Sequence, residues 1–166
     1  MSEKENKTIL LTGVAGFIGM HTSERLLESG YTLVGIDNLN DYYDVQLKKD
    51  RLKRLEKYAK FHFLEADIVN KDLLHQIFKK YDPSFVLHLA AQAGVRYSIT
   101  NPHAYIDANV QGFLNILEGC RSQKVEHLLY ASSSSVYGGN TNYPFQEHQN
   151  IDHPISLYAA TKKSNE

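Results

Sequence analysis

Short apolar runs alternate along the chain with longer segments in which apolar residues recur every three or four positions. This alternation is typical of parallel strands that are joined by crossover helices. The run from Thr8 to Thr12 reads Thr-Ile-Leu-Leu-Thr and predicts a buried first strand. Four later runs predict the remaining strands of one parallel sheet, at Thr32–Asp37, Phe61–Leu64, Phe85–Leu89 and His127–Ala131.

The segments between these runs predict helices. Phe17–Glu28 is followed by Gly30, which suits a helix C-terminus. Lys71–Tyr81 is amphipathic, and its inward positions are Leu73, Leu74, Ile77 and Phe78. The other two predicted helices are the charged segment Val45–Lys60 and the segment Ala104–Ser122, where Val110, Phe113, Leu114 and Leu117 have helical spacing. Because crossovers in parallel sheets are right-handed, these elements predict an α/β doubly wound sheet with strand order 3-2-1-4-5.

Composition narrows the functional classes. A chain of 166 residues with 42% hydrophobic and 22% charged residues fits one soluble domain. A net charge of −1 gives no reason to expect nucleic acid or an anionic membrane as a partner. No apolar run approaches the roughly 20 residues of a membrane span. Cys120 is the single cysteine, which excludes an internal disulfide and is typical of a cytoplasmic protein.

Three glycines, Gly13, Gly16 and Gly19, lie between the first predicted strand and the first predicted helix. Glycines at this place permit a tight turn and a close approach of a pyrophosphate, which the N–H groups of the helix N-terminus can bind. The spacing is G-x-x-G-x-x-G rather than G-x-G-x-x-G. Since glycines also make ordinary turns, the motif gains weight only from a second element.

That second element is Asp37, at the end of the second predicted strand. A carboxylate there can accept both ribose hydroxyls of a dinucleotide, and it would repel the additional phosphate of NADP, so NAD is favoured. Asp67 and the segment Leu89-Ala90-Ala91 end strands at the same edge of the sheet. They are candidates for contacts with the adenine ring and the inner ribose, the alternative being that they are ordinary strand ends.

Tyr158 and Lys162 lie four positions apart, which places them on one face of a helix. A nearby ammonium favours the phenolate form of tyrosine, so Tyr158 could take a proton from a sugar hydroxyl while Lys162 holds the nicotinamide ribose. The same pattern also occurs on ordinary helix surfaces. The run Ser132–Ser135 follows the fifth strand, and it either presents hydroxyls to a substrate or forms a polar turn.

With these residues the chain resembles the extended short-chain dehydrogenases/reductases, and among them the nucleotide-sugar epimerases. It is most similar to the UDP-glucuronate 4-epimerases of capsule and cell-wall polysaccharide pathways. The resemblance covers essentially the whole chain. Beyond the two motifs it rests on His88–Ser98, Asn101-Pro102, Tyr105, Asn109-Val110, Gly112, Asn115, Ala131–Gly138, Pro144 and Ser156-Leu157-Tyr158.

The resemblance implies a role for individual residues. Ser133, Tyr158 and Lys162 take the catalytic positions, and Arg96 and Ser135 are candidates for contact with the substrate. For Arg96, a purely structural role stays equally open. NAD is the implied cofactor, with contacts at Gly13, Gly16, Phe17, Ile18, Gly19, Asp37, Asn38, Asn40, Asp67, Ile68, Leu89, Ala90, Ala91, Asn109, Tyr158 and Lys162.

The resemblance also bears on the reaction. The related 4,6-dehydratases carry an Asp-Glu pair just after the catalytic Ser/Thr, and UDP-glucuronate decarboxylases carry a Glu at the second of these positions. Here the two residues are Ser134 and Ser135. Epimerisation at C4 of UDP-glucuronate to UDP-galacturonate through a 4-keto intermediate is therefore implied. A 4-epimerase of a neutral UDP-hexose or UDP-N-acetylhexosamine, or a non-catalytic NAD-binding sensor module, stays open.

Members of this family continue beyond the length of this chain, with a small C-terminal domain that grips the UDP. The resemblance therefore implies that residues 1–166 form an incomplete NAD-binding Rossmann domain, without the substrate-binding domain. We expect the chain alone to bind NAD weakly and to have little or no epimerase activity. The resemblance further implies a homodimer of the full-length protein, through the helix at Ala104–Ser122 and the helix after Ser156.

Three remaining features predict ordinary structure. The basic run Lys48–Arg54 is interleaved with acids, which favours a solvated helix face over a nucleic-acid patch. The histidines show no paired ligand spacing, so no metal site is predicted. Cys120, on an apolar helix, is interpreted as a packing residue rather than a nucleophile.

Overall fold

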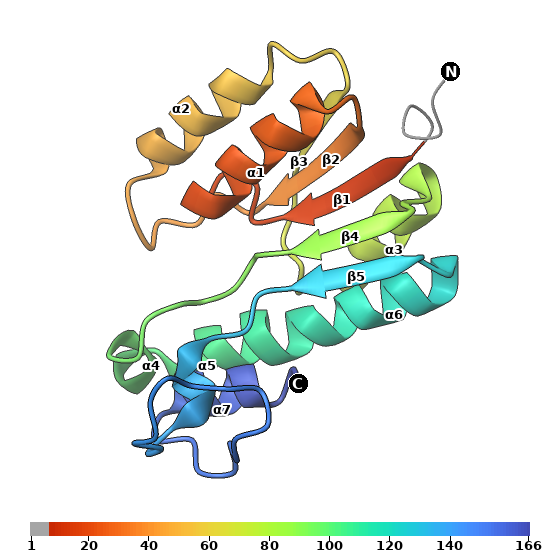
Figure 1. The fold of residues 1–166 in the computed structure, drawn as a ribbon. Helices are drawn as coiled ribbons and strands as arrows, with labels where there is room; N and C mark the ends of the chain where they lie inside the picture. Colours follow the sequence, from red (N-terminus) through yellow and green to blue (C-terminus); the bar gives the residue numbers. More distant parts are fainter. Residues whose placement is uncertain (1–6) are drawn as a thin grey trace. The chain divides into compact units, whose positions relative to one another are not determined.

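A computed structural model of the chain describes residues 7–166. Five parallel strands form one sheet in the order β3-β2-β1-β4-β5 (Figure 1), which confirms the predicted topology. The strands are β1 Thr8–Thr12, β2 Thr32–Asp37, β3 Phe61–Glu65, β4 Phe85–His88 and β5 His127–Tyr130. Only the C-terminal ends of the last three strands differ from the prediction, each by one residue.

Helices cover both faces of this sheet. Helices α1 (Phe17–Glu28) and α2 (Val45–Leu55) lie on one face, and α3 (Lys71–Tyr81) and α6 (Phe113–Gln123) lie on the other (Figure 1). Successive residues of β1 alternate between two apolar clusters: Leu10 packs in the α3/α6 cluster, and its two neighbours in the α1/α2 cluster. A parallel sheet buried on both faces is what the apolar strand runs require.

Helix α6 approaches helix α3 closely at Gly119. A Cβ atom added there would lie 2.5 Å from the Phe78 ring, so a larger residue would push the two helices apart. The neighbouring Cys120 packs against the same apolar cluster, and burial raises the pKa of its thiol to about 11. A thiol with so high a pKa is almost entirely protonated near neutral pH, in agreement with the interpretation of Cys120 as a packing residue.

Helix α2 is shorter than predicted, because it ends at Leu55 rather than Lys60. The Lys60 carbonyl accepts a hydrogen bond of 2.9 Å from the Leu33 N–H, and β3 begins at the next residue. The chain must therefore leave the helix early enough to reach the sheet. It does so through tight turns in which the Tyr58 N–H bonds to Leu55 and the Phe61 N–H bonds to Tyr58. The periodicity of apolar residues in the helix does not indicate that the chain must leave it at Leu55 to reach the sheet.

The predicted helix Ala104–Ser122 is present, but a π-helical segment interrupts it. It consists of α5 (Pro102–Tyr105), the π-helix η2 (Ile106–Gly112) and α6. Of its four predicted apolar positions only Phe113 is buried, while Val110, Leu114 and Leu117 are 36%, 52% and 40% exposed. A π turn holds an additional residue and so changes which side chains face inward. The homodimer through this helix stays a prediction.

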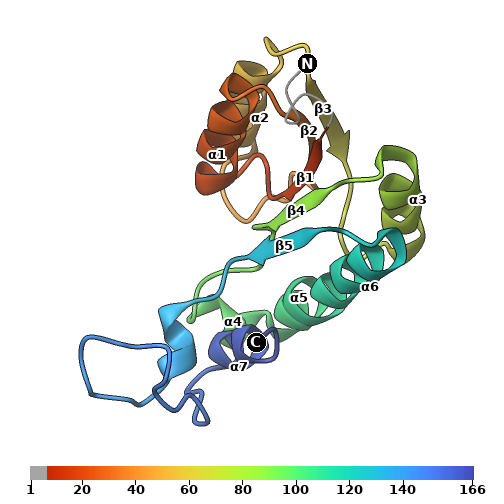
Figure 2. The ribbon, with the colours of Figure 1, turned by 45° about the vertical axis from the view of Figure 1, so that its right-hand side comes forward.

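The chain divides into two compact units. Among the described residues the first comprises 7–90 and 115–130, and the second comprises 91–114 and 131–166. The prediction of a single domain stays a prediction. The second unit contains α4 (Tyr97–Thr100), α5, η2, the 3₁₀ helix η3 (Ser134–Tyr137) and α7 (Leu157–Lys163). In this unit α7 lies beside α5 (Figure 2). Among residues 7–166, every helix is too short or too polar to cross a membrane.

Candidate functional site

The predicted glycine motif forms a turn that has no room for a side chain at Gly13 or Gly19. Gly13 has φ +75°, and a Cβ atom there would lie 2.8 Å from the Ala90 nitrogen. A Cβ atom on Gly19 would lie 2.0 Å from the Gly13 carbonyl oxygen. The glycines therefore allow the end of β1, the start of α1 and the end of β4 to approach one another at backbone distance.

Helix α1 begins at this turn without a capping side chain. Its N-cap residue is Gly16, and the first helical residues, Phe17 and Ile18, are exposed. The first N–H groups of a helix have no partner within the helix, and the helix dipole makes this end positive. A helix N-terminus that follows a glycine turn fits the phosphates of a dinucleotide.

The Asp37 carboxylate lies at the end of β2 and is only 8% exposed. Its Oδ2 accepts a hydrogen bond of 3.1 Å from the Ala15 N–H, and its Oδ1 accepts one of 3.0 Å from the Leu39 N–H. Oδ1 also lies 3.8 Å from the Lys48 ammonium. Since a carboxylate can accept about four hydrogen bonds, Asp37 keeps capacity for ribose hydroxyls.

The basic run Lys48–Arg54 was interpreted as a solvated helix face, and the burial of Lys48 corrects this interpretation. Lys49, Lys53 and Arg54 are exposed, whereas Lys48 is only 4% exposed. Its Nζ donates hydrogen bonds of 2.8 Å to both the backbone and the side-chain oxygen of Asn40. Burial lowers the pKa of Lys48, and the charge of Asp37 opposes this shift.

Sequence reasoning missed Lys48, although a signal was available. Lys48, Leu52 and Leu55 have the spacing i, i+4, i+7 and are the buried residues of α2. A lysine at this spacing lies on the inner face of the helix. In the same helix, Arg51 donates hydrogen bonds of 3.2 Å to the Ala15 carbonyl and 3.1 Å to the Tyr43 hydroxyl. Both cations thus reach the turn that holds Asp37.

The other predicted cofactor residues of the first unit also lie at strand ends. Asn38 donates a hydrogen bond of 2.9 Å to Asp67, whose other oxygen accepts from the Val69 N–H. The Ala90 N–H donates to the Thr12 hydroxyl at 3.1 Å, and this hydroxyl is also 2.7 Å from the His88 ring. Residues 37–40, 67–68 and 89–90 therefore gather at the carboxyl edge of the sheet, where ligands of open α/β sheets bind.

Helix α7 holds the predicted catalytic tyrosine and lysine in the second unit. Its N-cap Ser156 accepts a hydrogen bond from the Ala159 N–H. Lys162 is 5% exposed, and its Nζ donates a hydrogen bond of 3.0 Å to the Ala131 carbonyl. Tyr158 packs edge-to-face on Tyr105, with ring centroids 6.0 Å apart. The lysine thus fastens α7 to the residue that follows β5.

Ser133 lies two residues beyond Ala131 and is the N-cap of η3, which packs against α7. Its Oγ accepts a hydrogen bond of 3.2 Å from the Ser135 N–H. Because Oγ is the acceptor in that bond, its own proton stays available for a substrate oxygen. Ser133 thus lies at the start of a helix that packs against the helix of Tyr158 and Lys162. A hydroxyl, a phenol and an ammonium are groups of the kind that take part in proton transfer.

Asn109, a predicted cofactor contact, binds to the protein itself. Its amide nitrogen donates to the Gln92 carbonyl at 3.0 Å and to the Thr161 hydroxyl at 3.1 Å. Its oxygen accepts from the Gln92 N–H at 2.8 Å. Asn109 therefore ties the chain after β4 to α7. The predicted contacts of Ala91 and Arg96, both exposed in this segment, stay predictions, as does that of Ser135.

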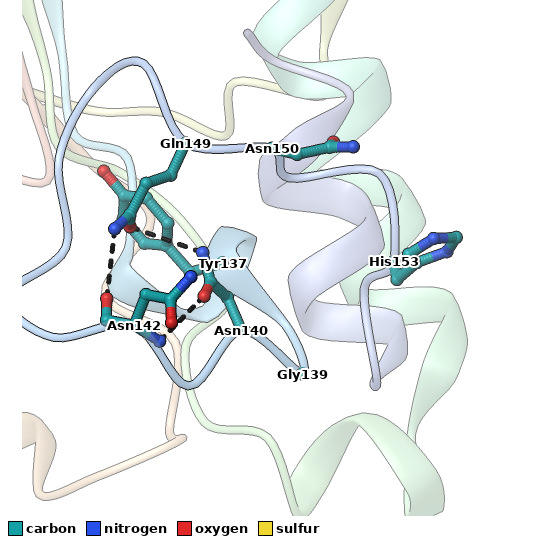
Figure 3. Close-up of a pocket in the computed structure, with 7 residues that line it drawn as sticks. All are labelled: Tyr137, Gly139, Asn140, Asn142, Gln149, Asn150 and His153. Atoms are coloured by element: carbon teal, nitrogen blue, oxygen red, sulfur yellow. Dashed lines mark hydrogen bonds between the residues drawn. The ribbon is translucent and has the colours of Figure 1, made fainter.

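A cavity of about 470 Å³ lies in the loop between η3 and α7. Figure 3 shows Asn140, Asn142 and Gln149 around it, bound to one another by hydrogen bonds. None of the predicted catalytic residues lines it. Within residues 7–166, no group of three or more His, Cys, Asp or Glu residues is arranged to hold a metal ion.

The buried amine of Lys162 leads to a pH-dependent prediction. Burial lowers its pKa in the folded chain, while the unfolded chain keeps a value of about 10.4. Between these two values the unfolded state binds more protons, so the free energy of unfolding should rise with pH. The free energy of unfolding is measured with urea between about pH 7 and 10. We expect it to rise more with pH in the wild type than in Lys162→Met. Lys163→Met is the matched control, and parallel curves for wild type and Lys162→Met would contradict the prediction.

Comparison with known proteins finds relatives among the nucleotide-sugar enzymes. The family model described as GDP-mannose 4,6 dehydratase matches residues 10–166. Protein CapI of Staphylococcus aureus is 56% identical over 158 residues, which are 95% of this chain and 47% of that protein. A UDP-glucuronate 4-epimerase of Thermodesulfobacterium geofontis is 50% identical over 157 residues, 95% of this chain and 48% of the relative.

A solved structure agrees with these relatives. The UDP-glucuronic acid 4-epimerase of Bacillus cereus, crystallised with UDP-glucuronic acid and NAD, superposes with a TM-score of 0.87. It is 36% identical, and the match covers 95% of this chain and 49% of that one. The chain therefore spans about half the length of the relatives it matches. These findings confirm the resemblance to nucleotide-sugar epimerases on which the site residues were predicted.

Proposed function

The chain belongs to the family described as GDP-mannose 4,6 dehydratase, and we propose that it forms the nucleotide-binding and catalytic part of an NAD-dependent nucleotide-sugar 4-epimerase. The observation that carries the proposal is the hydrogen bond from Lys162 to the Ala131 carbonyl. This bond fixes the helix of Tyr158 against the segment that carries Ser133. UDP-glucuronate is the proposed substrate, as the names of the Thermodesulfobacterium and Bacillus relatives suggest.

The proposed cofactor is NAD, which when bound would accept a hydride from C4 of the sugar and return it. The glycine turn and the first N–H groups of α1 fit its pyrophosphate. Asp37 would accept hydrogen bonds from the adenosine ribose. The remaining proposed contacts are those at residues 38, 40, 67, 68, 89–91 and 109, with Tyr158 and Lys162 at the nicotinamide end.

The proton at the sugar C4 hydroxyl is the part of the reaction that the protein would move. Tyr158 would take it as a general base and return it as a general acid. Lys162 would favour the phenolate through its charge, and Ser133 would donate its free proton to the sugar oxygen. Arg96 and Ser135 are the proposed substrate contacts, because a guanidinium suits a carboxylate or a pyrophosphate.

Elimination of water, the reaction in the family's name, needs an acid and a base beside the sugar. The residues after Ser133 are Ser134 and Ser135, which have no carboxylate to offer. We therefore propose epimerisation for this member of the family. Among these groups only Arg96 could meet the carboxylate at C6 of the sugar, and it suits the pyrophosphate equally well, so a neutral UDP-hexose or N-acetylhexosamine is the second candidate.

The test compares this chain with a version continued to the length of its relatives. Both are incubated with NAD⁺ and UDP-glucuronate, and UDP-galacturonate is separated by chromatography. We expect product from the longer protein. If the longer protein converts UDP-glucose or UDP-N-acetylglucosamine instead, that sugar nucleotide would replace UDP-glucuronate as the proposed substrate. If it binds NAD but converts no UDP-sugar, a sensor module would be favoured.

A further inference from the structure

Tyr105 is fully buried at the end of α5, and its side chain contacts two segments of the second unit. Its hydroxyl donates a hydrogen bond of 2.8 Å to the Ala93 carbonyl, with the Gly94 carbonyl as a second acceptor for the same proton. Its ring lies edge-to-face with the half-buried ring of Tyr158, at an interplanar angle of 75°. One side chain therefore joins the segment after β4 to the predicted catalytic phenol.

Asn109 makes a parallel connection further along the same helical stretch. It bonds to Gln92 in the segment after β4 and to Thr161 in α7. Tyr105 and Asn109 lie four positions apart where α5 continues into the π-helix η2, so they lie near one face of this stretch. Of the two residues, only Tyr105 contacts a side chain of the proposed proton-transfer set, that of Tyr158.

The contact with Tyr105 limits where the Tyr158 ring can lie. A tyrosine side chain can otherwise change rotamer, and aromatic rings favour the edge-to-face arrangement seen here. Tyr105 can hold its neighbour because its own ring is fully buried and packs on the ring of Tyr97, at a centroid distance of 6.2 Å. Proton transfer requires the phenol oxygen within hydrogen-bond reach of the sugar hydroxyl, so a displaced ring would lower the rate even in a folded protein.

We propose that Tyr105 is a positioning residue that links the segment carrying Arg96 to the orientation of the Tyr158 phenol. The inference rests on the proposed function, in which Tyr158 moves the C4 proton and Arg96 contacts the substrate. The hydroxyl of Tyr105 holds the backbone two and three residues before Arg96. The two ends of the side chain thus serve different steps, because the hydroxyl supports substrate binding and the ring supports proton transfer.

The test removes these two ends separately, in the chain continued to the length of its relatives and supplied with NAD⁺ and UDP-glucuronate. Tyr105→Phe keeps the ring and removes the hydroxyl. Its Michaelis constant should rise roughly fivefold, while its turnover number stays within about a factor of two of the wild type. Tyr105→Leu removes the ring as well, so its turnover number should also fall, by about tenfold. Both constants are measured by chromatography of the UDP-sugars.

Two controls separate positioning from a general loss of stability. Phe78 is a fully buried ring of the first unit, so Phe78→Leu should lower the free energy of unfolding but keep both kinetic constants within about a factor of two. The second control places Tyr105→Leu in a Tyr158→Phe background. There it should lower the residual turnover number less than about twofold, because the phenol that it positions is absent. A merely structural defect would lower the turnover number in both backgrounds.

The outcomes separate this inference from the function it rests on. A wild type that converts none of UDP-glucuronate, UDP-glucose and UDP-N-acetylglucosamine would overturn the proposed function and the inference together. An active wild type beside a folded Tyr105→Leu variant that behaves like Phe78→Leu would overturn the inference alone, as would an equal effect in the Tyr158→Phe background. If Tyr105→Leu does not fold, Tyr105→Phe decides. A higher Michaelis constant with the turnover number retained supports the proposal, and an unchanged Michaelis constant contradicts it.

Discussion

Replacing Tyr158 by phenylalanine should lower the turnover number for UDP-glucuronate by about 1,000-fold or more, because the group proposed to move the C4 proton is lost. The ring contact with Tyr105 does not involve the hydroxyl, so the fold of α7 should persist. The Michaelis constant should change little, since substrate binding does not depend on proton transfer. The rate is measured by chromatography of the UDP-sugars, with this chain continued to the length of its relatives.

The matched control is Tyr143→Phe. Tyr143 is 75% exposed and lies in the loop before α7, so the loss of its hydroxyl should leave the rate within a factor of two or so of the wild type. If Tyr158→Phe retained more than about a tenth of the activity, Tyr158 would not be the general acid and base. Ser133 would then be the next group to test for that role.

Gly19→Ala should have the second large effect, on stability and on nucleotide binding together. The added Cβ would lie 2.0 Å from the Gly13 carbonyl oxygen, which belongs to the backbone and cannot rotate away. The turn and the start of α1 must then separate, at a cost of about 3 kcal/mol in the free energy of unfolding. Because the N–H groups at the start of α1 are displaced, the dissociation constant for NAD⁺ should rise at least tenfold, which is a loss of about 1.4 kcal/mol in binding free energy.

Gly139→Ala is the control for this substitution, because no atom lies within 4 Å of its added Cβ and its φ is not in the left-handed range. Urea unfolding and calorimetric titration with NAD⁺ are run on both variants. We expect Gly139→Ala to behave like the wild type. A Gly19→Ala variant with unchanged stability and unchanged NAD⁺ affinity would show that neither property requires the close approach of the backbone at the turn.

The predicted site residues differ in how directly sequence could find them. Gly13, Gly19 and Asp37 could be predicted as cofactor contacts because their positions follow from strand ends, which the apolar runs define. Lys48 was missed because the acids around it suggested a solvated face, although its spacing from Leu52 pointed inward. The bonds of Asn109 to Gln92 and Thr161 join segments far apart in the chain, and no local pattern encodes them.

The sequence by itself determined the strand order, the presence of the four crossover helices and the place of the glycine turn. The physical reason is that these depend on local periodicity, on glycine geometry and on the handedness of crossovers. The tertiary structure alone decided where α2 ends, because β3 must meet the edge of β2 at Lys60. It also decided that Val110 and Leu114 are exposed, that Lys48 is buried beside Asp37, and that Lys162 bonds to Ala131. Each of these depends on a packing partner, or on a change of helix geometry, that neighbouring residues do not specify.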